Sequence, residues 1–265
     1  MQFRLSIEGI GYPGDTLIPP RFTCIMYHNI EGDSVNPYSI GPRAFKEQIR
    51  HFIDLGYVIE GFSGLSERLI SGRWPGKYLM ISFDDGHRSF LDAAEILNSF
   101  GIRGSFYLTR RLCLEMEDHL DPSEIRQLAT IADLGTHGLT HQPLTRLTPE
   151  AALNELVESK EWLEQCISRP VHSMTAPGGF WNARLQKMSE AAGYILVGTS
   201  KEWWNTPTSA ASSHSIARVA IRQMYTDLQV DDIVTLRRIF YLKRLIREKL
   251  IYLPKAILTR MPSQP

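Results

Sequence analysis

Cysteine is scarce in this 265-residue chain, which contains only Cys24, Cys113 and Cys166. Three thiols are too few and too scattered for a disulfide framework, and their odd number leaves at least one unpaired. We therefore expect reduced cysteines that are buried as small hydrophobic residues in a cytoplasmic protein.

The chain also lacks an excess of charge of either sign, since 29 basic residues balance 29 acidic ones. A balanced chain has no global attraction to nucleic acid, and no nucleic-acid partner is predicted. Its first residues show neither a basic stretch leading into an apolar run nor a small-residue cleavage site, which argues against a secretory signal. No stretch approaches the roughly 18 apolar residues of a membrane span.

Hydrophobic residues make up 43% of the chain, enough for the core of one α/β domain. Short apolar segments alternate with amphipathic helical patterns, which predicts a mainly parallel sheet. The expected strands are 22–30, 77–83, 104–108, 131–137, 170–175, 194–199 and 215–221. The expected helices are 42–56, 88–100, 123–130, 147–166 and 183–192. About seven strand and helix pairs favour a distorted (β/α) barrel over an open doubly wound sheet.

Four stretches with polar or glycine residues follow expected strands, at 27–29, 84–87, 137–141 and 175–179. In a parallel barrel the carboxyl ends of the strands surround one mouth, where catalytic residues lie. The acidic pair at 84–85 could instead cap the next helix, and a histidine pair four residues apart can arise by chance. Their positions at strand ends favour a functional site.

His137 and His141 would lie on one face of a helical turn, where both imidazoles could reach one ion. Asp85 or Asp84 would complete a two-His, one-Asp site. Such a site leaves coordination positions open for water and substrate, as hydrolysis requires. The second carboxylate could then take a proton from the water as general base.

These stretches resemble the motifs of the polysaccharide deacetylase family, also called the NodB-homology or carbohydrate esterase family 4 group, over about residues 22–222. SFDDG at 82–86 resembles the family's T-F-D-D-G, HGLTH at 137–141 its H-S/T-x-x-H, and TAPGG at 175–179 its R-x-P-x-G. The resemblance implies a hydrolase that removes an acetyl group from an N-acetylated sugar, whether polysaccharide, oligosaccharide or lipid-linked.

The resemblance makes Asp84 the general base and Asp85, His137 and His141 the ligands of one divalent ion. Zn²⁺ is expected first, although such donors also accept Co²⁺, Mn²⁺ or Ni²⁺. The ion would activate a water and polarise the acetyl carbonyl while Asp84 takes the water's proton. The oxyanion would be held by the ion and by a backbone N–H near Gly178.

The chain also departs from the family pattern. Thr175 stands where many members have an arginine that orients the base, and Gly178 replaces the usual aromatic residue. Orientation of the base must come from elsewhere. Arg218 could pair with an acid at the barrel mouth, but it is not selected as a site residue. The late Leu-x-His motif, which supplies the leaving-group acid, has no counterpart, so His28 and His214 are the candidates, unless they are structural or solvated.

Trp203 and Trp204 could wall the acetyl pocket or stack on a sugar, or could simply pack in the core. Pro177 is predicted to contact the substrate with them. Two other functions stay open: another amide hydrolase of non-peptide C–N bonds on the same scaffold, and a metal-containing carbohydrate-binding module without turnover. The sequence does not indicate the oligomeric state.

We divide the chain into an N-terminal extension at 1–21, the barrel at 22–222 and a basic amphipathic tail at 223–265. Within the tail, residues 235–260 carry eight basic residues and one acidic residue. The predicted apolar side consists of Leu236, Ile239, Phe240, Leu242, Ile246 and Leu250, and the basic residues beside it are Arg237, Arg238, Lys243, Arg244, Arg247 and Lys249. This helix could pack on the barrel or lie on an anionic membrane, at the inner face in the case of a lipid-linked substrate.

Overall fold

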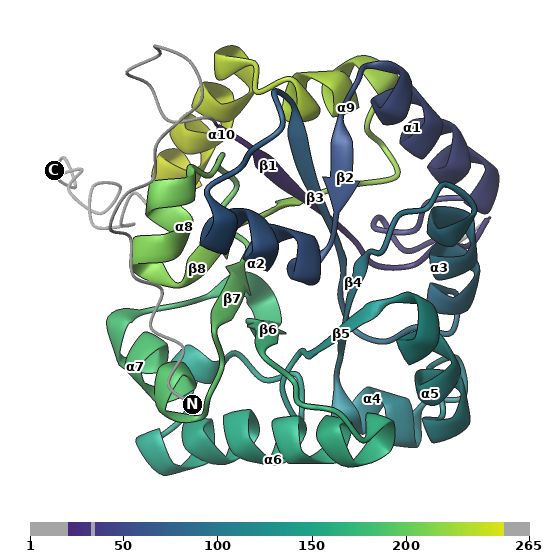
Figure 1. The fold of residues 1–265 in the computed structure, drawn as a ribbon. Helices are drawn as coiled ribbons and strands as arrows, with labels where there is room; N and C mark the ends of the chain where they lie inside the picture. The colour runs from purple at the N-terminus through teal and green to yellow at the C-terminus, as the bar shows by residue number, and fades with distance from the viewer. Residues whose placement is uncertain (1–20, 33–34, 252–265) are drawn as a thin grey trace, which may run out of the picture.

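The computed structural model describes residues 21–32 and 35–251. The predicted N-terminal extension lies outside this part of the chain except for Arg21, as does the end of the predicted tail. Ten α-helices are described in this part of the chain, and for most of its length they alternate with the strands (Figure 1).

The strands form one parallel sheet that closes into a barrel (Figure 1). Going round the barrel, neighbouring strands follow the order β8-β7-β6-β5-β4-β3-β1-β9, and β2 pairs with β3 outside this path. The strands are β1 Thr23–Tyr27, β2 Val58–Glu60, β3 Tyr78–Phe83, β4 Ser105–Leu108, β5 Asp133–Thr136, β6 Ser173–Thr175, β7 Leu196–Thr199, β8 Ser215–Ala217 and β9 Val219–Ala220. The predicted α/β barrel is confirmed.

The barrel is closed by a single segment that contains both β8 and β9. Only Arg218 separates these two strands, and β8 pairs with β7 while β9 pairs with β1. Counted as one, they give seven strands in the ring formed by the described residues, with β2 as an additional strand. The sequence analysis missed β2 because its three residues are too few for a periodic pattern.

Most of the helices cover the outside of the barrel, whereas the helix at 62–71 lies across one end of it and packs Leu65 against strand residues such as Met80 (Figure 1). The helices are α1 Pro42–Asp54, α2 Phe62–Ser71, α3 Phe90–Ser99, α4 Arg110–Glu115, α5 Pro122–Ile131, α6 Pro149–Ile167, α7 Ala183–Ala191, α8 Pro207–Ser213, α9 Asp227–Val234 and α10 Arg238–Ile251. Local sequence explains several starts: Thr148 caps α6 by accepting from Ala151 N–H, and Pro149 follows at the first helical position. The expected helices are all present, and α2, α4, α8 and α9 are additional short ones.

Strands covered on both faces provide the core. All six residues of β3 are buried, as its continuous apolar run predicts. Phe83 at its end stacks on Phe106 with ring centroids 4.3 Å apart and lies edge-on to Phe45 and Phe90. Burying a phenylalanine contributes about 1.5–3 kcal/mol, so this cluster holds the end of β3 firmly in place. The carboxylates at 84 and 85 therefore start from a rigid support.

The beginning of the C-terminal helix belongs to the fold of the barrel. Tyr241 on α10 is buried, and its hydroxyl donates to Ile233 carbonyl oxygen at 2.8 Å and lies 2.9 Å from Thr23 Oγ1 on β1. Because the tyrosine hydroxyl donates to a carbonyl, the threonine hydroxyl is the donor in the second bond. This network ties α10 to the first strand.

The predicted apolar side of this helix is divided between core and solvent. Phe240 is buried and Leu236 packs against the core, whereas Ile239, Leu242 and Ile246 are exposed. Packing on the barrel, one of the two predicted alternatives, therefore applies to only part of this apolar side. The side chain of Leu250 lies outside the described residues. None of the described helices is long and apolar enough to cross a membrane.

Candidate active site

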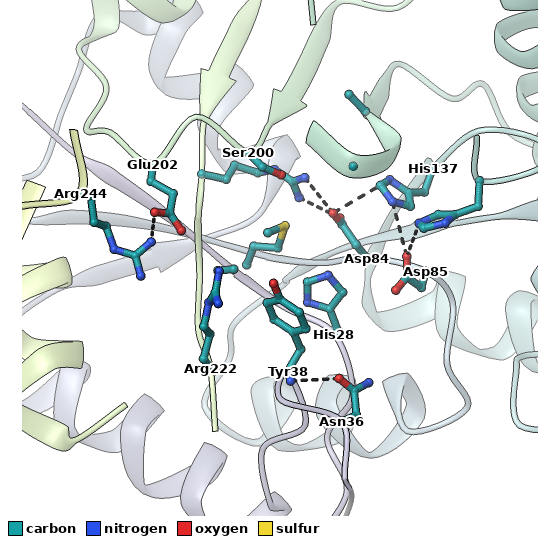
Figure 2. A pocket seen from close by; sticks show the side chains of 16 residues that line it. His28, Asn36, Tyr38, Asp84, Asp85, His137, Ser200, Glu202, Arg222 and Arg244 are labelled. Atoms are coloured by element: carbon teal, nitrogen blue, oxygen red, sulfur yellow. Dashed lines mark hydrogen bonds and ion pairs between the residues drawn. The ribbon is translucent and has the colours of Figure 1, made fainter. Parts of the chain in front are cut away.

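The carboxyl ends of the barrel strands surround a pocket of about 590 Å³ (Figure 2). Most of the chemical groups singled out in the sequence line it: His28 after β1, Asp84 and Asp85 after β3, and His137 and His141 after β5. The pairing of strands at the barrel mouth brings together residues that lie more than one hundred positions apart.

Asp85, His137 and His141 form a candidate metal triad. One ligand atom from each side chain lies within 4.8 Å of the other two. Asp85 Oδ1 is 3.4 Å from His137 Nε2 and 3.1 Å from His141 Nε2, and this buried oxygen has no aligned hydrogen-bond donor among the described residues. A buried carboxylate oxygen facing two imidazole nitrogens fits a divalent cation of the zinc class.

The backbone of Asp85 holds its side chain in this position. Asp85 adopts a φ of +89°, which is uncommon for a residue other than glycine and costs about 1–3 kcal/mol. Its carbonyl oxygen accepts from Thr109 N–H at 3.1 Å, so neighbouring strand β4 offsets part of this strain. Such strain at the end of a buried strand is characteristic of functional sites.

The prediction that His137 and His141 lie on one helical turn is wrong. Residues 137–143, which we call the histidine loop, form an irregular segment in which Gly138 and His141 have φ values of +78° and +66°. Glu155 on α6 shapes this loop, since its buried carboxylate accepts from the N–H of Leu139 at 2.7 Å and of Thr140 at 3.0 Å. The hydroxyl of Thr140 also contacts Glu155. A local helix is thus replaced by a loop clamped from a neighbouring element.

Thr175 fixes the orientation of His137. The Thr175 hydroxyl donates to Asp84 Oδ1 at 3.1 Å and lies 2.6 Å from His137 Nδ1. Because this hydroxyl donates to a carboxylate, it accepts from the imidazole, and Nδ1 carries the proton. His137 Nε2 is then left with a lone pair that faces the other members of the triad, as a metal ligand requires.

Arg218 is the partner of Asp84. Its Nη1 and Nη2 each donate to a different oxygen of the carboxylate at 2.7 Å, and the side chains are 0% and 3% exposed. Arg218 lies between β8 and β9, so the segment that closes the barrel supplies the orienting arginine. Thr175 stands where the family pattern has an arginine, and here a guanidinium reaches Asp84 from another strand segment.

Burial and neighbouring charges shift the pKa values of the site's aspartate and histidines in different directions. Burial acts to raise the pKa of Asp84, but the guanidinium of Arg218 and the imidazole of His137 outweigh it and hold the pKa below its ordinary value. Burial lowers the pKa of His137, which favours the neutral imidazole. Interaction with the carboxylate of Asp85, which acts as acceptor and negative charge, raises the pKa of His141, so a proton and a metal ion compete for that ring.

His28 lies in the pocket, as a residue in contact with substrate must. Its Nδ1 is buried without a hydrogen-bond partner among the described residues, and its ring lies 4.7 Å from that of Tyr38. His214, in contrast, directly precedes β8 and so lies at the amino end of the barrel, away from this mouth. Its Nδ1 lies 3.3 Å from Ile195 carbonyl oxygen, which is a structural environment.

Of the other residues predicted to contact the substrate, only Gly178 lines this pocket. Gly178 lines the pocket with a φ of +66°, whereas Pro177 is buried and does not line it. Trp203 and Trp204 stack on one another at 4.1 Å and pack edge-on against Tyr241, outside the described lining of this pocket. The interpretation of the two tryptophans as a pocket wall is therefore wrong, and the alternative of core packing applies.

Sequence reasoning gave Glu155 no role and did not select Arg218. No local signal distinguishes Glu155 from the other acidic residues of an amphipathic helix. Arg218 offered one signal, because it interrupts an apolar strand pattern in the sequence SIARVAI at 215–221. A charged residue inside a buried strand needs a buried partner, and Asp84 is that partner.

The family model described as polysaccharide deacetylase matches residues 71–197. The YxkH protein of Bacillus subtilis (strain 168), whose name places it among the polysaccharide deacetylases, is 24% identical over 186 residues, which cover 69% of this chain and 66% of that protein. The chain thus spans slightly less than two thirds of this relative.

Solved structures share the fold. The deacetylase PplD of Streptococcus pyogenes, solved with acetate, superposes with a TM-score of 0.74 at 19% identity, covering 82% of this chain and 99% of that one. The polysaccharide deacetylase BC0361 of Bacillus cereus gives a TM-score of 0.70 at 24% identity, covering 82% and 69%. IcaB of Ammonifex degensii gives 0.70 at 17% identity, covering 84% and 97%.

Proposed function

We propose that this chain is a metal-dependent hydrolase of the polysaccharide deacetylase family, which removes the acetyl group from an N-acetylated sugar. The observation that carries the proposal is the buried, ionised Asp84, which Arg218 holds beside the candidate metal triad. A carboxylate kept charged in a pocket and next to three ligand side chains suits a base that acts on water.

The metal triad would hold one divalent ion, with Zn²⁺ the first expectation and Co²⁺, Mn²⁺ or Ni²⁺ also compatible with the donors. When bound, such an ion supplies Lewis-acid activation of water and of the acetyl carbonyl. Asp85 contributes the charge of the site, and the two imidazoles bind through Nε2. Thr175 keeps His137 in the tautomer that this requires.

Asp84 takes the proton of the attacking water in this proposal. Its two oxygens are fixed by Arg218, so the base is oriented before the substrate arrives. The low pKa keeps the carboxylate ionised throughout the neutral range, and general bases of this kind contribute about 10²–10⁴ in rate. The backbone N–H of Gly178 is proposed as the donor to the developing oxyanion.

His28 is proposed as the acid that protonates the leaving amine. It lies in the pocket near Asp84 and has a buried nitrogen with no partner in the described part of the chain. We expect His28→Gln to lower kcat about 10²–10⁴-fold on an N-acetyl sugar but far less on 4-nitrophenyl acetate, whose leaving group departs without a proton. An equal loss on both substrates would count against a role in leaving-group protonation.

The test of the function is acetate release from N-acetylglucosamine oligomers and lipid-linked N-acetyl sugars, with the bound metal counted in every sample. The samples are metal-loaded wild type, chelated protein, Asp84→Asn, and Asp92→Asn as a matched exposed control on α3. Asp84→Asn should lower kcat about 10²–10⁴-fold at unchanged metal content, and the control should keep wild-type activity.

The same experiment decides between the alternatives. One metal ion per chain with no release from any sugar, but release from a non-sugar amide, would identify another C–N hydrolase. Metal and sugar binding with no turnover at all would identify a binding module. The ionised Asp84 argues against that outcome, because a binding module has no use for an oriented base.

Contact with a membrane surface through α10 is a second proposal, favoured by the exposure of Ile239, Leu242 and Ile246 at helical spacing beside basic residues. Sedimentation with vesicles that contain anionic lipid should recover the wild type in the pellet. A triple Ser variant at these three positions should stay in the supernatant, and equal recovery of the two proteins would contradict membrane contact.

A further inference from the structure

The pocket extends beyond the metal triad to charged side chains that the proposed reaction does not use. They are Arg222, Arg244 and Glu202, and all three line the same cavity. Figure 2 shows them across the pocket from the metal triad, with His28 and Tyr38 between. A substrate whose acetyl group reaches the metal triad therefore extends toward these residues.

Three separate elements bring these charges together. Arg222 follows β9 by two residues, Glu202 lies in the loop after β7, and Arg244 comes from α10. None of these positions is adjacent to another in the sequence, so their meeting is a product of the fold. The C-terminal helix thereby contributes directly to the pocket.

Both guanidinium groups lie over aromatic rings. Arg222 is 5.1 Å from the ring centroid of Tyr38, and Arg244 is 4.9 Å from Phe240 and 5.4 Å from Tyr225. Stacking occupies the face of a guanidinium and leaves its N–H donors pointing outward in the plane. This planar fork matches the oxygens of a phosphoryl or carboxylate group, which it can bind with two parallel hydrogen bonds.

The two arginines of this region differ in their ion-pair partners. Arg244 contacts Glu202 directly. In residues 21–32 and 35–251, by contrast, no carboxylate lies within 4.0 Å of Arg222, and its buried Nε has no hydrogen-bond partner. Leaving such a donor without an acceptor costs about 1–3 kcal/mol, which a ligand oxygen would recover.

The rest of the lining offers few aromatic faces on which a neutral sugar could stack. Among the described residues that line the pocket, Tyr38 is the only Phe, Tyr or Trp, and Arg222 covers its ring. Trp203 and Trp204 are packed against α10 instead. Recognition here must therefore depend on charge more than on stacking.

We infer that Arg222 and Arg244 form a subsite for an anionic group, phosphoryl or carboxylate, carried by the acetylated sugar or by its neighbour. This inference rests on the proposed deacetylase function and names the class of substrate as an anionic N-acetyl sugar. Arg222 makes the charge-assisted contact, and Glu202 holds Arg244 at the edge of the subsite.

The test compares neutral N-acetylglucosamine and its β-1,4 disaccharide with N-acetylglucosamine 1-phosphate and a glucuronate-containing N-acetyl disaccharide. Wild type, Arg222→Gln, Arg222→Lys and the exposed control Arg73→Gln are assayed for acetate release. The ratio of kcat/KM for anionic over neutral substrates should fall about 10–100-fold in Arg222→Gln, mainly through KM. Arg222→Lys should recover part of the ratio, and Arg73→Gln should not change it. A preference for the phosphate or for the glucuronate substrate identifies the source of the negative charge.

A binding measurement keeps this inference separate from the proposed function. Calorimetry with N-acetylglucosamine 1-phosphate on chelated protein excludes coordination of the phosphate by metal, and wild type should bind about 10–100-fold more tightly than Arg222→Gln. Arginine-dependent binding without acetate release from any substrate would support the subsite and reject the deacetylase. Acetate release with an unchanged anionic-to-neutral ratio, and equal affinity of both proteins for the phosphate, would overturn the subsite and retain the deacetylase.

Discussion

Replacing Arg218 with methionine removes one half of a buried ion pair while keeping a side chain of similar length. The two N–O distances are both 2.7 Å, and the side chains of Arg218 and Asp84 are 0% and 3% exposed, so solvent does not screen the pair. Breaking a buried pair from one side costs about 3–5 kcal/mol, because the remaining charge has lost its cationic partner. We expect the free energy of unfolding of chelated protein at pH 7 to fall by about this amount.

The loss should depend on pH in a defined direction. In the wild type the pKa of Asp84 is depressed, so its contribution to stability is present above the unfolded-state pKa and is lost as the pH falls through the folded pKa. Without Arg218, burial is the largest remaining influence and raises the pKa of Asp84 in the folded protein. The folded variant then takes up a proton on acidification, and the difference from wild type should shrink between pH 7 and pH 5.

Urea unfolding followed by circular dichroism at both pH values measures these differences. The double variant Arg218→Met/Asp84→Asn is the control, since it removes both charges and should recover most of the loss at pH 7. The contact of Arg218 Nε with Thr199 carbonyl oxygen, at 3.2 Å, is lost in both variants and sets the part that does not recover. A loss that is equal at the two pH values, together with a double variant no more stable than the single one, would refute the reasoning.

Two other residues, Glu155 and Gly179, give direct tests of the contacts that hold the site in place. Glu155→Gln should weaken metal affinity about 10–100-fold in a chelator competition, because an amide offers the histidine loop one acceptor oxygen in place of two and no negative charge. Unchanged affinity would contradict the clamp. Gly179→Ala should lower the free energy of unfolding by about 1–3 kcal/mol, because its φ is +75° and a Cβ would meet Ser200 Cβ at 2.1 Å. Gly76→Ala, which meets nothing within 4 Å, is the matched control and should be nearly neutral in the same melts.

The architecture and the carboxylate–histidine cluster could be predicted because both depend on local sequence. Buried parallel strands such as β3 are continuous apolar runs, and residues that follow them must gather at one mouth. That rule is enough to predict that Asp85 lies near His137, without any knowledge of side-chain geometry. It also explains why His214 was a poor candidate, since it precedes its strand and the histidines of the site follow theirs.

What could not be predicted depends on distant contacts and on backbone detail. The partner of Asp84 is 134 positions away and is chosen only when the barrel closes. The path between His137 and His141 is set by Glu155 from a neighbouring helix, so spacing alone suggested a helical turn where a clamped loop exists. Amphipathic patterns likewise do not reveal how narrow the contact of α10 with the barrel is.

The last strand segment of the barrel has a consequence for the order in which activity can arise. A ribosome makes the motifs around Asp84, His137 and His141 well before it makes Arg218, which sits in the segment that joins β7 to β1. A nascent barrel that still lacks this segment contains the candidate metal ligands, but Asp84 has no arginine to orient it. Completion of the ring and orientation of Asp84 are thus one event, and under the proposed function an unfinished chain lacks its oriented base.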